Sequence, residues 1–228
     1  MKTAFVTGSS SGIGYAITNM LLELGFIVIG VSRKDFKINN QNYIHIKSNL
    51  TRYDDIVKLA DILKKKNIFL HVNCAGFGKF QPHEELSYQD IQDMVMLNLT
   101  SPMILTSATL RSLKKNGGYL INITSIEALK SSKFAGVYSA TKAGLKSFGD
   151  SLFEETRKTN LSVTNIIPDM TESNFYENLR FDVSDNINQK LLSEDIAQAI
   201  KHILSLRKGA VVQNYTIRSL NFGIKKSH

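Results

Sequence analysis

A tyrosine and a lysine stand four residues apart in the stretch YSATKAGLKSF, residues 138 to 148. On a helix, Tyr138 and Lys142 would share one face, and only small residues lie between them in the sequence. A tyrosine has a pKa of about 10 and donates a proton poorly near neutral pH. A neighbouring ammonium group lowers that pKa, so Tyr138 could be a proton donor whose pKa is lowered by Lys142. The spacing alone favours a simpler interpretation, a half-buried tyrosine and a solvated lysine on an amphipathic helix.

A glycine-rich turn near the N-terminus is the second feature that could do chemistry. Gly8, Gly12 and Gly14 in TGSSSGIGYAI follow an apolar run and precede a helical pattern. Glycine lets the backbone turn tightly and approach a pyrophosphate closely, and the N-terminus of the next helix favours negative charge. The strand–turn–helix context therefore favours nucleotide binding over a purely structural turn.

The elements that must position these residues alternate along the chain. Short apolar runs predict strands at 3–7, 27–31, 43–47, 68–73, 118–124, 161–167 and 210–216. Longer amphipathic patterns predict helices at 12–24, 52–66, 89–114, 136–158 and 193–206. This alternation predicts an α/β fold with a mostly parallel sheet, covered by helices on both faces. Such sheets bind ligands beyond the carboxyl ends of their strands, where several of the unusual residues fall.

The composition is that of an ordinary globular protein, with 228 residues of which 43% are hydrophobic and 21% charged. It predicts one domain, residues 1–228. The net charge of +8 is dispersed, so we expect no nucleic-acid partner and an anionic cofactor or substrate instead. The single cysteine, Cys74, excludes an intrachain disulfide framework. No signal peptide pattern is present, and the longest apolar run, 26–31, is too short to span a bilayer, which predicts a cytoplasmic protein without a membrane partner.

Five motifs follow one another at characteristic spacings. After TGSSSGIG come NCAG at 73–76, Asn98 in MLNLTSP, Ser125 in NITS, and the Tyr138 and Lys142 pair thirteen residues beyond that serine. Together they resemble the short-chain dehydrogenase/reductase family over essentially the whole chain. The resemblance reverses the interpretation of Tyr138 and Lys142 in favour of catalysis.

The resemblance implies a fold and an activity. The fold is a single doubly wound Rossmann-type domain with a mostly parallel seven-stranded sheet. The activity is hydride transfer between a nicotinamide cofactor and the carbonyl or alcohol carbon of a small molecule, without a metal. Members of the family usually form homodimers or homotetramers. A catalytically idle nucleotide-binding sensor on the same fold is the alternative, and nothing in the sequence selects a substrate.

The resemblance also assigns roles to four catalytic residues. Tyr138 would be the proton donor in reduction and the base in oxidation. Lys142 would bind the ribose hydroxyls of the nicotinamide half and lower the tyrosine pKa. Ser125 would hydrogen-bond the substrate carbonyl oxygen as charge builds on it. Asn98 would hold a water that links Lys142 to solvent, or would simply satisfy buried backbone groups.

The expected cofactor site is larger and departs from the family pattern in three places. Asn49 stands where the family often has aspartate, and Pro168 is followed by Asp169 in place of glycine. Residues 170–190, where members carry a substrate lid, are short and polar, and Phe175, Tyr176, Leu179 and Phe181 would form an apolar wall or pack a short helix. Either Thr171 or Ser173 would supply the hydroxyl that contacts the carboxamide. The full expected set comprises Gly8, Ser10, Ser11, Gly12, Ile13, Gly14, Ser32, Arg33, Asn49, Leu50, Asn73, Ala75, Gly76, Tyr138, Lys142, Pro168 and Thr171.

The end of the second strand predicts which cofactor is preferred. NAD-preferring relatives place a carboxylate at the position of Ser32, where it binds the ribose hydroxyls and would repel a 2′-phosphate. Ser32 removes that repulsion, and Arg33 adds a charge-assisted contact, so NADP(H) is expected to be preferred over NAD(H). Asp35 complicates this expectation because it could pair with Arg33 or turn towards the ribose.

Overall fold

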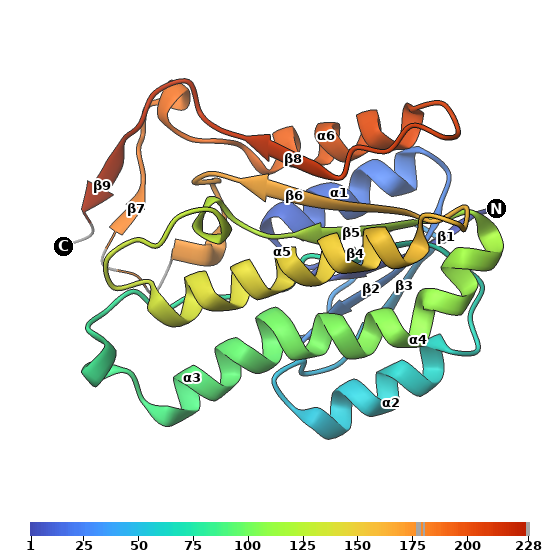
Figure 1. The fold of residues 1–228 in the computed structure, drawn as a ribbon, viewed down its shortest axis with the longest axis horizontal. Coiled ribbons are helices and arrows are strands. Elements are labelled where there is room, and N and C mark those ends of the chain that lie inside the picture. Colours follow the sequence, from blue (N-terminus) through green and yellow to red (C-terminus); the bar gives the residue numbers. More distant parts are fainter. Residues whose placement is uncertain (177–178, 180, 227–228) are drawn as a thin grey trace.

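The computed structural model describes residues 1–176, 179 and 181–226. Its centre is a sheet of seven parallel strands in the order β3-β2-β1-β4-β5-β6-β8 (Figure 1). The direction of winding reverses between β1 and β4, so the predicted doubly wound α/β fold is confirmed. The strands are β1 (Thr3–Thr7), β2 (Ile27–Ser32), β3 (Tyr43–Lys47), β4 (Ile68–Asn73), β5 (Tyr119–Ile123), β6 (Ser162–Pro168) and β8 (Asn214–Ile217).

Helices cover both faces of the sheet (Figure 1). Neighbouring residues of a strand point to opposite faces, so alternate positions supply two separate cores. In β1, Val6 packs towards one face and Phe5 towards the other, and both are fully buried. The helices over the first face are α1 (Gly12–Glu23) and α6 (Ser193–Ser205), and those over the second are α2 (Tyr53–Leu63), α4 (Ser101–Asn116) and α5 (Gly136–Thr156).

The long helix expected at 89–114 is interrupted. It consists of α3 (Tyr88–Val95), a π-helical turn at Met96–Thr100 and then α4. Asn98 lies within this turn and is fully buried. Single π turns inside helices are rare and are frequent at functional sites, because they redirect one side chain out of the regular helical pattern.

Four asparagines form a ladder across the sheet, which we call the asparagine ladder: Asn73 of β4, Asn122 of β5, Asn165 of β6 and Asn214 of β8. They are in register on adjacent strands. Each side-chain amide donates to the carbonyl oxygen of the next, at 2.9, 3.1 and 3.2 Å. Gly149 of α5 packs onto the ladder, since a side-chain carbon there would collide with the amides of Asn165 and Asn122. The ladder thus fixes the relative register of four strands.

The C-terminal part differs from the prediction. The seventh strand was expected from residue 210, but β8 begins at Asn214. Two further strands were missed: β7 (Phe181–Val183) and β9 (Ile224–Lys226), which pair antiparallel beyond the end of the main sheet (Figure 1). Each is only three residues long and pairs with a segment far away in the sequence, so neither leaves a periodic pattern. The proposed lid at 170–190 also includes residues 177, 178 and 180, which lie outside the described residues.

Candidate active site

A long groove runs past the carboxyl ends of β1, β2 and β4. It has a volume of about 860 Å³ and joins a smaller pocket of about 220 Å³, because Ile13, Cys74, Gly76, Ser173 and Phe175 line both. Of the expected cofactor-binding residues, those lining the groove are Gly8, Ser10, Ser11, Gly12, Ile13, Gly14, Ser32, Arg33, Asn49, Leu50, Ala75 and Gly76.

The other expected cofactor residues lie elsewhere. Pro168, Thr171, Tyr138 and Lys142 line the smaller pocket. Asn73 lines neither cavity, because its side chain is buried in the asparagine ladder. The sequence motif NCAG therefore contributes to the groove through Cys74, Ala75 and Gly76, while its asparagine orders the sheet beneath.

The glycine-rich turn fits a pyrophosphate. Gly8 has a φ of +72°. It packs so closely on the residues that follow β4 that a Cβ would lie 3.0 Å from the Cα of Ala75. Helix α1 begins at Gly12, with no capping side chain among the described residues and no acidic residue in its first turn. The amide groups and positive dipole end of α1 are thus left for an anionic ligand.

The far end of the groove carries the features expected to select the cofactor. Ser32 is buried, and its hydroxyl contacts the carbonyl oxygen of Lys34 and Nε2 of His45, both at 2.8 Å. Asp35 forms an ion pair with Lys47 at 2.8 Å. Arg33 is exposed, lines the groove and has no ion pair with any described residue. Of the two alternatives expected for Asp35, pairing with Arg33 is not seen, because its carboxylate pairs with Lys47 instead.

Asn49 lines the groove and stands where the family often has aspartate. Its side-chain carbonyl accepts hydrogen bonds from the backbone amide of Thr51 at 3.2 Å and from the Thr51 hydroxyl at 3.1 Å. These contacts fix the turn before α2 and orient the amide so that its NH₂ group is the remaining donor. An aspartate could not offer that donor.

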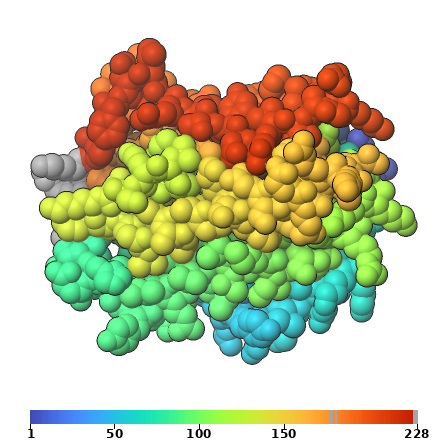
Figure 2. All heavy atoms as spheres, viewed as in Figure 1, coloured from blue at the N-terminus to red at the C-terminus, as the bar shows by residue number. Residues whose placement is uncertain are grey.

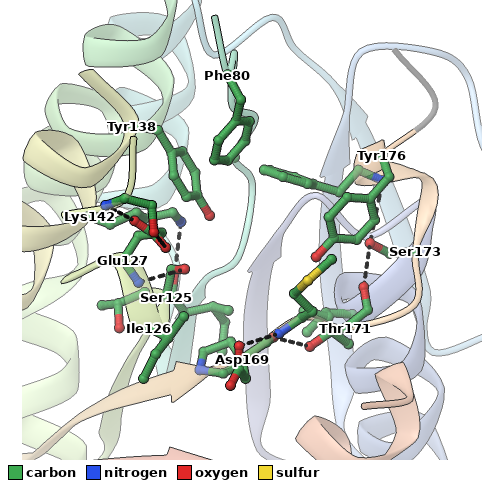
Figure 3. A pocket seen from close by; sticks show the side chains of 18 of the residues that line it. Phe80, Ser125, Ile126, Glu127, Tyr138, Lys142, Asp169, Thr171, Ser173 and Tyr176 are labelled. Carbon is green, nitrogen blue, oxygen red and sulfur yellow. Dashed lines mark hydrogen bonds between the residues drawn. The ribbon is translucent and has the colours of Figure 1, made fainter. Parts of the chain in front are cut away.

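The smaller pocket brings together the residues expected to be catalytic (Figure 3). Tyr138 and Lys142 lie one turn apart in α5, and only 7% and 4% of them is exposed. Ser125 follows β5 and begins a 3₁₀ turn, where its hydroxyl accepts a hydrogen bond from the backbone amide of Glu127 at 3.2 Å. The Ser125 hydroxyl also lies close enough to the Tyr138 phenol to lower its pKa slightly. The pocket therefore presents two neighbouring hydroxyl groups to a ligand.

The electrostatics correct one expectation. Lys142 was expected to lower the pKa of Tyr138, but burial raises that pKa to about 12, and the Ser125 hydroxyl opposes the rise only in part. Lys142 Nζ lies 5.8 Å from the centre of the tyrosine ring and donates to the carbonyl oxygen of Ile123 at 3.0 Å. Burial also lowers the pKa of Lys142 to about 8. Burial is the largest cause of both shifts, because it disfavours the charged form of each side chain.

Asn98 satisfies buried backbone groups in the structure. Its amide donates to the carbonyl oxygen of Phe77 at 2.8 Å and accepts from the Phe77 amide at 3.1 Å. It also donates to the Thr141 hydroxyl, one residue before Lys142. A Cβ on Gly76 would lie 3.2 Å from both Asn98 Oδ1 and Lys142 Nζ, so glycine keeps the space between these two side chains open. The structural role expected for Asn98 is present, and its role in holding a water stays a prediction.

Asp169 accommodates the departure from glycine without backbone strain. Among the described non-glycine residues only Phe134 has a positive φ. The Asp169 carboxylate is nearly buried, accepts from Arg218 Nε at 2.8 Å and accepts from the Met170 amide at 3.0 Å. It therefore ties the loop after β6 to the residue that follows β8. Arg218 was missed from the sequence, since its only signal is a cation directly after β8.

Glu127 is a pocket residue that the sequence did not reveal. The Glu127 carboxylate accepts from the Ser132 amide and hydroxyl and from the Ser139 hydroxyl, which fixes the loop between β5 and α5. The hydroxyls of Thr171 and Ser173 both line the pocket and both donate to backbone oxygens, so the choice between them stays open. Burial raises the pKa of Cys74 to about 12, which keeps its thiol protonated.

The part of the chain that the structure describes contains no cluster of three or more side chains that could hold a metal ion. Within the same residues, no helix combines the length and apolar character needed to cross a membrane.

Comparisons with known proteins agree with this geometry. The family described as short chain dehydrogenase matches residues 2–184. An uncharacterized oxidoreductase of Staphylococcus haemolyticus is 31% identical over 229 residues, covering 95% of this chain and 96% of its own. Two solved structures share the fold. An alcohol dehydrogenase from the archaeon Thermococcus sibiricus, complexed with 5-hydroxy-NADP, has a TM-score of 0.84 at 22% identity, covering 96% of this chain and 97% of its own.

The second structure is a 4-hydroxyisoleucine dehydrogenase complexed with NADH, with a TM-score of 0.85 at 24% identity. The match covers 96% of this chain and 98% of that one. The sequence match to the family extends over most of the chain, and the cavities lie where the fold places its ligands. The chain belongs to the short-chain dehydrogenase family and is an NAD(P)-dependent dehydrogenase or reductase.

Proposed function

We propose that this protein reduces a ketone or aldehyde with NADPH, or catalyses the reverse oxidation, and that Ser125, Tyr138 and Lys142 perform the chemistry. The observation that carries the proposal is their convergence: three side chains from two elements line one pocket that opens into the cofactor groove. Lys142 is almost completely buried and forms no ion pair with a described residue. Burying such groups costs free energy, which a catalytic role explains.

The nicotinamide cofactor, when bound, supplies or accepts the hydride. In reduction, the Ser125 hydroxyl donates a hydrogen bond to the substrate carbonyl oxygen and stabilises the negative charge that develops there. Tyr138 then gives its phenolic proton to that oxygen. Its raised pKa keeps the phenol protonated at neutral pH, as a proton donor requires. Lys142 stabilises the phenolate that remains, since its ammonium group lies on the same face of α5.

The cofactor preference rests on the far end of the groove. No carboxylate stands at Ser32, and the Arg33 guanidinium is exposed without an ion pair among the described residues. A guanidinium is well suited to a 2′-phosphate, because its planar donors match phosphate oxygens. We propose a preference for NADP(H) over NAD(H) of about ten- to a hundredfold, equivalent to about 1.5–3 kcal/mol for a charge-assisted contact.

A screen of purified protein against a broad panel of ketones and aldehydes tests the proposal. NADPH consumption is followed by its absorbance, NADH is run in parallel, and the Tyr138→Phe variant is the matched control. Turnover of at least one compound by the wild type, and its loss in the variant, is the expected result. NADPH binding without turnover of any compound would favour the idle nucleotide-binding sensor instead.

Several further expectations stay predictions. These are a single domain from residue 1 to 228, a cytoplasmic location and assembly as a homodimer or homotetramer. The substrate is a small molecule.

A further inference from the structure

Beyond Tyr138, the pocket is walled by four aromatic side chains, which we call the aromatic box: Phe80, Phe175, Tyr176 and Phe181. Their ring centres are 5.1 Å apart for Phe80 and Phe181, 5.2 Å for Phe175 and Tyr176, and 5.9 Å for Tyr176 and Phe181. The Tyr138 ring lies 5.3 Å from Phe80 and 5.6 Å from Phe175, so the box borders the expected proton donor (Figure 3). An apolar group attached to a reacting carbonyl would contact this wall.

The outer side of the pocket is supplied by the C-terminal segment. Phe222 and Ile224 line the pocket, and they remain 66% and 49% exposed. They are held there because β9 pairs with β7. The Asn221 amide also donates to the carbonyl oxygen of Asn188 at 2.9 Å. In the space-filling view, the C-terminal residues form a continuous red band that reaches the same end of the molecule as the orange lid residues (Figure 2). Two large apolar side chains thus lie at the mouth of the pocket, and a ligand can cover their exposed surface.

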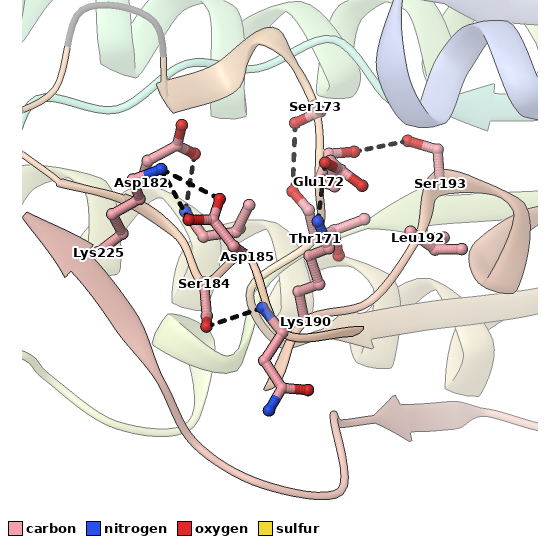
Figure 4. A network of polar contacts seen from close by, with 12 residues as sticks. Thr171, Glu172, Ser173, Asp182, Ser184, Asp185, Lys190, Leu192, Ser193 and Lys225 are labelled. Carbon is pink, nitrogen blue, oxygen red and sulfur yellow. Dashed lines mark hydrogen bonds and ion pairs between the residues drawn. The ribbon is translucent and has the colours of Figure 1, made fainter. Parts of the chain in front are cut away.

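An ion pair adds to this attachment. Lys225 Nζ contacts the Asp185 carboxylate at 2.8 Å, so the strand next to the pocket is joined to the residues that follow β7 (Figure 4). On the other side of the lid, Lys190 pairs with Glu172 at 2.9 Å, and the Ser193 hydroxyl donates to the carbonyl oxygen of Glu172. The lid is therefore anchored both to β9 and to the start of α6.

The charged groups that line the pocket already have partners within the protein. Glu127 accepts three hydrogen bonds, and Lys130 lies 3.8 Å from its carboxylate. Asp169 is paired with Arg218 at 2.8 Å. Burial raises the pKa of Tyr176, which keeps that phenol neutral. Apart from Lys142, which the proposed mechanism uses, the described residues thus offer no uncompensated charge to a substrate.

We propose that the substrate is an uncharged carbonyl compound or alcohol with an aromatic or branched apolar group, and that Phe222 and Ile224 set its upper size. The inference rests on the proposed function, because it names the substrate class of that same pocket. Apolar groups gain from contact with the aromatic box, whereas a charged group would lose its hydration without a compensating partner. The small pocket volume favours a compact molecule.

A binding experiment tests the substrate class independently of turnover. The wild-type complex with NADP⁺ is titrated by calorimetry with acetophenone and with 4-acetylbenzoate, which differ by one carboxylate. Neither ketone can be reduced by the oxidised cofactor, so the measurement reports binding alone. Acetophenone is expected to bind about tenfold or more tightly. Equal affinity, or tighter binding of 4-acetylbenzoate, would overturn the inference.

A second experiment tests the size limit. The kcat/KM values for acetophenone, propiophenone and butyrophenone are measured in the wild type and in the double variant Phe222→Ala, Ile224→Ala. The variant is expected to raise the ratio of butyrophenone to acetophenone about tenfold, since removing the outer wall admits the longer chain. Leu220→Ala is the matched control, because Leu220 is 84% exposed on the same segment and does not line the pocket.

The outcomes distinguish a failure of the proposed substrate class from a failure of the proposed function. If the ratio of kcat/KM for butyrophenone to that for acetophenone is unchanged in the double variant, and cofactor affinity is intact, Phe222 and Ile224 do not limit substrate size. Turnover confined to charged ketones in the broad panel would overturn the substrate class and leave the proposed function standing. No turnover of any compound would contradict the proposed function, while the calorimetric comparison would still decide whether the pocket selects uncharged apolar ketones.

Discussion

The groove and the smaller pocket that joins it form one cleft, and its two ends are built from different parts of the chain. The cofactor groove is lined by glycines, small polar side chains and backbone that directly follow β1, β2 and β4. The substrate pocket is closed instead by aromatic side chains from the lid and by the C-terminal segment, which meet through β7 and β9. A site attached to the sheet suits a ligand that stays the same, whereas a site closed by peripheral segments can change without disturbing the sheet.

Replacement of Tyr138 by Phe tests the chemistry at the boundary between the two ends. The ring still packs against Phe80 and Phe175, and only the proton donor is lost. We expect kcat to fall by about a hundredfold to ten-thousandfold, with the Kd for NADPH nearly unchanged. Steady-state kinetics and NADPH fluorescence titration measure the two quantities. A kcat close to that of the wild type would refute the proposed mechanism.

Replacement of Ser125 by Ala tests a contact that belongs to the substrate end alone. The hydroxyl contact strengthens as the carbonyl oxygen gains charge, so its loss is felt mainly in the transition state. We expect kcat to fall by about a hundredfold and KM to rise much less. The opposite pattern, a raised KM with kcat intact, would reduce Ser125 to a ground-state contact.

The pH profile tests Lys142, which lies where the two ends meet. Burial lowers its pKa to about 8, so the ammonium group is present below that pH and is lost above it. Since the charge stabilises the phenolate left by proton transfer, kcat/KM for reduction should fall about tenfold per unit above about pH 8. Measurement with a neutral ketone between about pH 6 and 10 shows this. A profile that stays flat to the upper limit would contradict the assigned role.

Replacement of Arg33 by Ala tests the cofactor end alone. We expect the ratio of kcat/KM for NADPH to that for NADH to fall about tenfold, since the guanidinium contact to the 2′-phosphate is lost. The relative activity towards different ketones should not change. Lys34→Ala is the matched control on the neighbouring cation. Equal use of the two cofactors by the wild type, or a preference that survives in Arg33→Ala, would exclude this assignment.

The smallest effect is expected from Asp185→Asn, which removes the ion pair to Lys225. Both side chains are exposed, and such pairs contribute little because solvent screens them. The backbone pairing of β7 with β9 remains, so kcat/KM should change by less than about twofold. A much larger loss would show that the ion pair, rather than the strand pairing, holds the C-terminal segment at the pocket.

The division between the two ends also explains what the sequence could predict. Gly8, Gly12, Gly14, Ser125, Tyr138 and Lys142 stand in local motifs at the ends of strongly periodic elements, and the fold places all of them on the cleft. The mostly parallel sheet follows from alternating strands and helices, each of which is readable within a short window.

Other features depend on contacts between distant segments and left no local pattern. Phe222 and Ile224 reach the pocket only because β9 pairs with β7, some forty residues earlier in the chain. The role of Arg218 depends on its ion pair with Asp169. The π-helical turn at Asn98 interrupts a stretch whose sequence pattern predicts one helix. The direction of the Tyr138 pKa shift was wrong, because the sequence shows the neighbouring lysine but not the extent of burial.

The asparagine ladder restricts how this chain can exchange segments with its relatives. Each of Asn73, Asn122 and Asn165 is buried and acts as partner to the next, so replacing one leaves polar groups unpaired inside the sheet. Gly149 is tied to the same arrangement, because no larger residue fits against the amides. We therefore expect these positions to be inherited as a block, and hybrid enzymes made by recombination to fold best when their crossover points lie outside residues 73–165.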